Sequence, residues 1–138
     1  MSSTSVDRSH GRSRVYFVAW GKECDPEAIS RATGIAPTKT WRIGDIRQER
    51  TGKTHLDCGW RLDADNTDGR EVETQISSLL EALWPVHEYL TALTPRCEMQ
   101  FSIVVHCRES APPVYLSTAQ MQRIAQLGAG LDIDIYCG

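Results

Sequence analysis

The sequence predicts an α+β domain in which helices pack on one face of a mostly antiparallel sheet of five to six strands. Segments rich in β-branched and aromatic residues alternate with segments whose apolar residues recur every three to four positions. The expected order is β-α-β-β-α-β-(β)-α-β, and a similar pattern at 14–43 and 99–137 suggests two β-α-β halves. The 138 residues suffice for one domain, 14–138, after a polar tail, 1–13, that we expect to be disordered.

The first half of the chain carries clear boundary signals. The residues 14–20, RVYFVAW, form an apolar strand. A helix then begins after Asp25, a good N-cap, with Pro26 at its first position, and ends at Gly34. A second strand, 37–43, follows this helix.

A polar, basic hairpin loop, 46–53, connects that strand to a third strand, 54–62. Gly44 and Gly59 are expected to shape the hairpin, and Gly52 its turn. Alternation along the third strand predicts a core-facing side made of Leu56, Cys58, Trp60 and Leu62.

The second half contains the longest helix, 70–93, which we expect Pro85 to divide because proline removes a helical hydrogen bond. Strands are predicted at 99–107 and 131–137, with a short extended piece at 114–116. Ser117 and Gln120 form a capping box that begins the last helix, whose inward residues are expected to be Met121, Ile124 and Leu127.

Charge and cysteine content limit the location and the partners. Residues 1–62 carry a net charge of +4 and residues 63–138 carry −7, which suggests two surfaces with different partners.

No apolar run is long enough to cross a bilayer, and the first residues lack a secretory signal, so we expect a cytoplasmic protein. Five cysteines without a C-x-x-C pair are then expected to be reduced thiols.

The order of several short motifs resembles the bacterial family called domain of unknown function 4279. The similarity covers about residues 14–137 and implies a small single-domain protein without an established activity, cofactor or catalytic residue. The motifs that carry the resemblance are Asp25-Pro26 with Ile29, Thr33-Gly34-Ile35 with Pro37, Trp41 with Gly44-Asp45, Gly59-Trp60, the leucine-rich helix, Leu127-Gly128, and Asp132-Ile133-Asp134-Ile135-Tyr136.

Candidate catalytic and metal sites each conflict with a spacing or face requirement. The acidic loop 63–69 resembles a calcium-binding loop but lacks the glycine and glutamate that such a loop needs. A metal set of His55, Asp57, His106 and Cys107 has no ligand spacing, and a cysteine–histidine dyad through Cys58 or Cys107 has no local support. We therefore predict neither an enzyme nor a cofactor.

Two groups of residues are candidates for interaction with a partner. The first surrounds the hairpin and combines an aromatic ring with cations: Trp41, Arg42, Asp45, Arg47, Arg50 and Lys53. The second is Asp132 and Asp134, which alternate with apolar residues and are expected on the solvent side of the last strand.

These groups predict a protein-binding module, such as an immunity or accessory protein whose acidic half complements a basic toxin. The alternative is a binder of nucleic acid or another anionic ligand through the basic loop 42–53, which the overall charge of −3 disfavours. Both a monomer and a homodimer are compatible with the sequence.

Overall fold

The computed structural model describes residues 11–65 and 71–137. Its elements follow the predicted α+β order, with an additional small hairpin. They are β1 (Arg12–Gly21), α1 (Pro26–Thr33), β2 (Lys39–Trp41), β3 (Ile46–Gln48), β4 (Lys53–Thr54), β5 (Cys58–Asp63), α2 (Val72–Leu83), the 3₁₀ turn η2 (Trp84–Val86), α3 (His87–Thr91), β6 (Glu98–His106), α4 (Thr118–Leu127) and β7 (Gly130–Tyr136).

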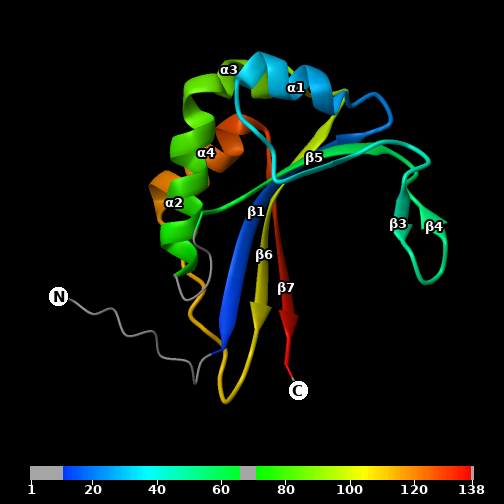
Figure 1. The fold of residues 1–138 in the computed structure, drawn as a ribbon. Coiled ribbons are helices and arrows are strands. Elements are labelled where there is room, and N and C mark those ends of the chain that lie inside the picture. Colours follow the sequence, from blue (N-terminus) through cyan, green and yellow to red (C-terminus); the bar gives the residue numbers. More distant parts are fainter. Residues whose placement is uncertain (1–10, 66–70, 138) are drawn as a thin grey trace.

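Five strands form one sheet in the order β2-β5-β1-β6-β7, and β3 pairs with β4 in a separate hairpin. Every pair in the large sheet is antiparallel except β6 with β7, so the prediction of a mostly antiparallel sheet is confirmed. The helices lie on one side of the sheet, whereas the β3–β4 hairpin extends away on the other side (Figure 1). We call the hairpin, residues 44–55, the arm.

The two predicted β-α-β halves differ in how their strands meet. In the second half, β6 and β7 are direct parallel neighbours joined through α4. In the first half, β5 lies between β1 and β2 and is antiparallel to both, which makes β1 and β2 parallel but not adjacent. The first half therefore forms a continuous part of the sheet only because β5, which comes later in the chain, pairs with both β1 and β2. No local sequence pattern indicates this pairing.

The core lies between the helices and the sheet. Alternate residues of β1 and β6, such as Phe17 and Phe101, are fully buried there, and their rings meet edge to face at 5.3 Å. Trp60 on β5 is also fully buried, as predicted, and its indole N–H donates to the Ser30 hydroxyl of α1 at 3.0 Å. This bond lets a large ring enter the core without leaving its polar atom unpaired.

Two buried glutamines join the helices to their neighbours. Gln75 of α2 accepts a hydrogen bond from the Val15 N–H of β1 at 2.9 Å and donates to the Ser13 carbonyl at 3.2 Å. Gln120 of α4 donates to the Glu73 carbonyl of α2 at 2.8 Å. Gln75 satisfies backbone groups of β1 that burial would otherwise leave unpaired, and Gln120 connects α4 to α2.

The predicted helix boundaries are confirmed where side chains cap them. Asp25 accepts from the N–H groups of Glu27 and Ala28, and Gly34 ends α1 in the left-handed conformation. The Ser117–Gln120 capping box is present in full. Pro85 lies in the 3₁₀ turn that separates α2 from α3, as its missing N–H predicts.

Several strand predictions were wrong in detail. β1 begins at Arg12, so Arg12 and Ser13 belong to the sheet and not to a disordered tail, while residues 1–10 lie outside the described residues. The expected strand 54–62 is interrupted, because the His55 N–H donates across the arm to the Asp45 carbonyl at 2.8 Å. Leu56 is consequently 79% exposed instead of buried.

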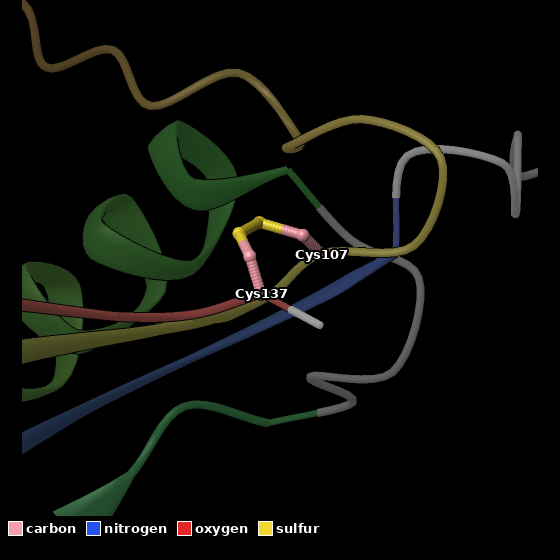
Figure 2. The surroundings of a disulfide bond; sticks show 2 residues. All are labelled: Cys107 and Cys137. Carbon is pink, nitrogen blue, oxygen red and sulfur yellow. A yellow bond between two sulfur atoms is a disulfide. The ribbon is translucent and has the colours of Figure 1, made fainter.

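Corrections also apply to the second half. Residues 114–116 form no strand, and Met121 is exposed because α4 turns Gln120 towards α2 in its place. Cys107 and Cys137 form a disulfide, contrary to the expectation of five reduced thiols (Figure 2). The bond joins the end of β6 to the residue after β7.

Candidate interaction surfaces

The eight predicted interaction residues lie in two groups at opposite edges of the sheet. Trp41 belongs to β2, one edge strand, and the neighbouring turn and arm carry Arg42, Asp45, Arg47, Arg50 and Lys53. Asp132 and Asp134 belong to β7, the other edge strand. The structure therefore does not unite them in one site, and each surface needs its own account.

Trp41 is half-buried on the side of the sheet that faces away from the helices. Its ring packs over Gly59 of the neighbouring strand β5, where any side chain would overlap the indole. The ring stacks on His55 with centroids 4.9 Å apart, and its N–H donates to the Asp57 carboxylate at 3.3 Å. Trp41 thus connects the sheet to the base of the arm.

Arg42 and Asp45 are engaged in local structure. The Arg42 guanidinium contacts Asp25 at 3.3 Å and Glu27 at 3.1 Å, so its charge is compensated at the beginning of α1. The Asp45 carboxylate accepts from the Arg42 N–H at 2.8 Å and thereby closes the turn into the arm. Both line an open hollow of about 540 Å³ beside α1 and β2, which also includes Trp41.

The Asp25 carboxylate has a lowered pKa, first because it accepts from the Ala28 N–H and then because of Arg42. A lowered pKa in the folded protein means that this contribution to stability is complete above the ordinary value of 3.8 and is lost as the pH falls below it. At neutral pH the carboxylate is ionised, so the Arg42 pairing is intact. Arg42 is accordingly a poor candidate for binding a further anion.

The arm carries the cations that remain available. Among the described residues, no carboxylate forms an ion pair with Arg47, Arg50 or Lys53. Arg47 and Lys53 line an open hollow of about 460 Å³ together with His55 and Asp57. Ile46 on the arm and Leu56, the residue that follows it, are exposed apolar side chains.

The β7 surface combines acidic and apolar side chains. The register with β6 places Asp132 and Asp134 beside Ser102 and Val104, on the side of the sheet away from the helices. Leu131, Ile133 and Ile135 lie beside core residues of β6 on the helix side, as expected, yet they are 43%, 44% and 58% exposed. β7 lies at the edge of the sheet, and the helices leave its apolar side partly uncovered.

The helix-free face of the sheet also carries residues that were not among the predicted interaction residues. The Arg61 guanidinium lies 4.0 Å from the centre of the Tyr16 ring and donates to the Asp63 carboxylate at 2.6 Å. Tyr136 stacks on His106 with centroids 5.2 Å apart. Alternation along β1 and β5 could have indicated this face, but only the strand order brings these side chains together.

The positions of the candidate ligands bear on the two metal sites that the sequence analysis considered. His55 lies on the arm, whereas His106 ends β6 and Cys107 is disulfide-bonded, so the metal set that the sequence analysis considered is not brought together. No group of three or more His, Cys, Asp or Glu residues within 11–65 and 71–137 is arranged to hold a metal ion. The suggested calcium loop includes residues 66–70, which lie outside the described part of the chain.

The free cysteines are buried and therefore poor nucleophiles. Burial raises the pKa of the Cys24 thiol, and the adjacent Cys97 raises it further. Burial likewise raises the pKa of Cys97. Cys58 is buried on β5, so the dyad suggested for Cys58 or Cys107 has no accessible thiol.

Together, the helix layer on one side of a mixed five-stranded sheet and the two charged edges define a small α+β domain. The model of the family "Domain of unknown function (DUF4279)" matches residues 10–138. The chain belongs to this family, as its motifs suggested. No curated protein and no solved structure matches the chain. Within the described residues, no helix is both long and apolar enough to cross a membrane.

Proposed function

We propose that this protein is a non-enzymatic bacterial protein-binding module, such as an immunity or accessory protein, whose β7 surface contacts a basic partner. The supporting observation is the combination of Asp132 and Asp134 with the exposed apolar side chains of the same strand. Exposed apolar groups beside polar ones are typical of protein interfaces, and opposite charges guide partners into register. A basic secreted toxin has the required chemistry.

Charge around β7 favours a cationic partner. Neither Asp132 nor Asp134 forms an ion pair with a cation in the described ranges, so both charges are available. The two carboxylates are two residues apart on one strand and therefore project from the same face of the sheet. A partner with matching cations can contact both at once.

The test compares partner binding by the wild type and by Asp132→Asn/Asp134→Asn. Affinity capture from the native cell identifies the partner, and calorimetry with the purified pair gives the dissociation constant. We expect the double variant to bind roughly 3- to 10-fold more weakly, because two exposed ion pairs are worth about 0.7 to 1.4 kcal/mol together. The control, Glu81→Gln/Glu88→Gln, removes two exposed acids from the helices and should bind normally. Equal affinity of all three proteins would contradict the proposal.

The alternative function is binding of nucleic acid or another anionic ligand through the arm. The observation that favours it is the hollow lined by Arg47 and Lys53, whose charges have no acidic partner in the described residues. Cations that neutralise phosphates make binding strongly dependent on salt.

Fluorescence anisotropy with a labelled single-stranded oligonucleotide tests this alternative. Salt-sensitive binding that weakens in Arg47→Ala/Lys53→Ala, but not in Arg96→Ala/Arg108→Ala, would support it. Both double variants remove two exposed cations, and only the first pair lies on the arm. Absence of binding at low salt would exclude it.

A cytoplasmic location is also part of the proposal, and the Cys107–Cys137 bond makes it testable. Reducing compartments keep most cysteine pairs as thiols, whereas oxidising compartments preserve disulfides. Rapid alkylation of a native cell extract, followed by mass spectrometry, measures the redox state of this pair. Free thiols at both positions would support the cytoplasm, and a persistent bond would favour an oxidising compartment.

A further inference from the structure

We propose that β7 binds its partner by backbone pairing, adding to the sheet an extended segment whose residues alternate between basic and apolar. This inference rests on the proposed protein-binding function and specifies its geometry and the chemistry of the partner. In the strand order, β7 has β6 on one side and no paired strand on the other among the described residues. An exposed strand edge is a ready template for another strand.

The backbone groups at this edge can be assigned. The Tyr136 carbonyl accepts from the Cys107 N–H at 2.9 Å, so the backbone of Tyr136 faces β6. Because successive residues of a strand point their N–H and C=O groups to opposite sides, Asp132 and Asp134 also face β6. Leu131, Ile133 and Ile135 therefore present their N–H and C=O groups at the free edge. These three residues provide the hydrogen-bonding template.

The side chains define what the added strand must carry. On the helix side it would extend the row formed by Ile133 and Ile135, which are 44% and 58% exposed. On the opposite side it would lie beside Asp132 and Asp134. Cross-strand neighbours are most stable when apolar groups meet apolar groups and charges meet opposite charges. The matching segment thus alternates Lys or Arg with Val, Ile or Leu.

A second copy of this chain fits poorly on the same edge. Antiparallel pairing of two β7 strands that keeps both helix layers on one side overlaps most fully when it is centred on Ile133, the middle residue of the strand. This register sets Asp132 opposite Asp134 of the second copy, and a shift of the centre to Asp132 or to Asp134 sets that carboxylate opposite itself. Like charges directly opposite one another destabilise a strand pair, so charge favours a different, basic partner.

The edge is also held in an extended shape before binding. β7 is paired with β6 from Gly130 to Tyr136, which holds it extended in either redox state, and in the oxidised protein the Cys107–Cys137 bond also fixes its far end (Figure 2). An ordered template reduces the entropy lost when a flexible segment binds.

The experiment uses the full chain, labelled with ¹⁵N, and a blocked peptide of sequence Lys-Val-Lys-Val-Lys-Val-Lys. A peptide of the same composition in block order, and one with Glu in place of Lys, are the controls. We expect only the alternating basic peptide to shift β7 resonances and to slow exchange of the Leu131, Ile133 and Ile135 amides at least tenfold. Binding of the block peptide with equal strength, shifts confined to other elements, or no binding at millimolar peptide would overturn the inference.

Two variants separate backbone pairing from side-chain contact. Ile133→Pro and Ile133→Ala both remove the isoleucine side chain, but only the proline removes the outward N–H. We expect the proline variant to bind the peptide at least tenfold more weakly than the alanine variant, with NMR spectra confirming that both are folded. Equal binding by the two folded variants would refute backbone pairing. If Ile133→Pro does not fold, the amide-exchange measurement on the wild type still decides.

This outcome is distinguishable from failure of the proposed function. The edge-pairing inference fails if the peptide does not slow exchange of the outward amides. The protein-binding function can still hold in that case, because the native partner can bind Asp132→Asn/Asp134→Asn more weakly than the wild type. The protein-binding function fails if the identified partner binds both proteins equally, whatever the peptide does.

Discussion

At the scale of single residues, Trp41 and Gly59 form a pair in which the missing side chain of one determines the position of the other. The Trp41 indole occupies the space that a Gly59 side chain would need, and from there it reaches His55 and Asp57. The sequence suggested that Gly59 shaped a hairpin, whereas its role is to admit the ring. Trp41 is therefore both a packing residue and part of the arm's base.

Gly59→Ala is expected to displace the Trp41 ring and to lower the free energy of unfolding by roughly 1 to 3 kcal/mol, the usual effect of overpacking. Urea unfolding measures the loss, and the NMR signal of the Trp41 indole N–H reports the broken contact with Asp57. The matched control is Gly130→Ala, because nothing lies within 4 Å of the position its added carbon would occupy. If both variants unfold at the same urea concentration, the close packing of Trp41 on Gly59 is wrong.

At the scale of the elements, the ends of β6 and β7 are joined by a bond that the cysteine pattern did not predict. Cys107 and Cys137 are separated by 30 residues in sequence, yet the parallel pairing of β6 with β7 brings their Cα atoms to 4.8 Å. That separation lies within the ordinary range for a disulfide. The remaining cysteines, Cys24, Cys58 and Cys97, are buried as expected for small apolar side chains.

Removing this bond is expected to destabilise the domain. Closing a loop of 30 residues restricts the unfolded chain, so Cys107→Ser/Cys137→Ser should lower the free energy of unfolding by roughly 3 to 4 kcal/mol. Urea unfolding of the oxidised wild type, the reduced wild type and the double variant measures the effect. The two proteins without the bond should unfold together, before the oxidised one. Coincidence of all three curves would show that the bond does not contribute.

At the scale of the whole molecule, opposite charges lie at opposite edges of the sheet. The cations of the arm lie beside β2, and the carboxylates of Asp132 and Asp134 lie on β7. The contrast between a basic first half and an acidic second half of the sequence thus becomes, in part, a separation in space. This separation lets the two surfaces be tested independently.

The repulsion between β7 strands leads us to expect a monomer, with a sedimentation mass of about 15.5 kDa at neutral pH. Asp134→Lys would place a cation opposite Asp132 of a second copy in the register centred on Ile133, so this variant should self-associate. Asp132→Lys/Asp134→Lys restores like charges and should remain monomeric. Sedimentation at several concentrations measures all three, and a wild-type dimer would contradict the expectation.

The sequence by itself determined the features that depend on neighbours within a few positions. Asp25, Gly34 and the Ser117–Gln120 pair mark helix ends because caps form between residues close in sequence. Pro85 divides the long helix for an equally local reason. The family was also recognisable, because its motifs lie in a fixed order along the chain.

Only the tertiary structure decided what depends on pairing between distant segments. It inserted β5 between β1 and β2, turned Leu56 outward by pairing His55 across the arm, and brought Cys107 to Cys137. It also placed the two predicted interaction groups at separate edges. Alternation along one strand shows which side chains share a face, but the strands beside it determine whether that face and its edge are covered.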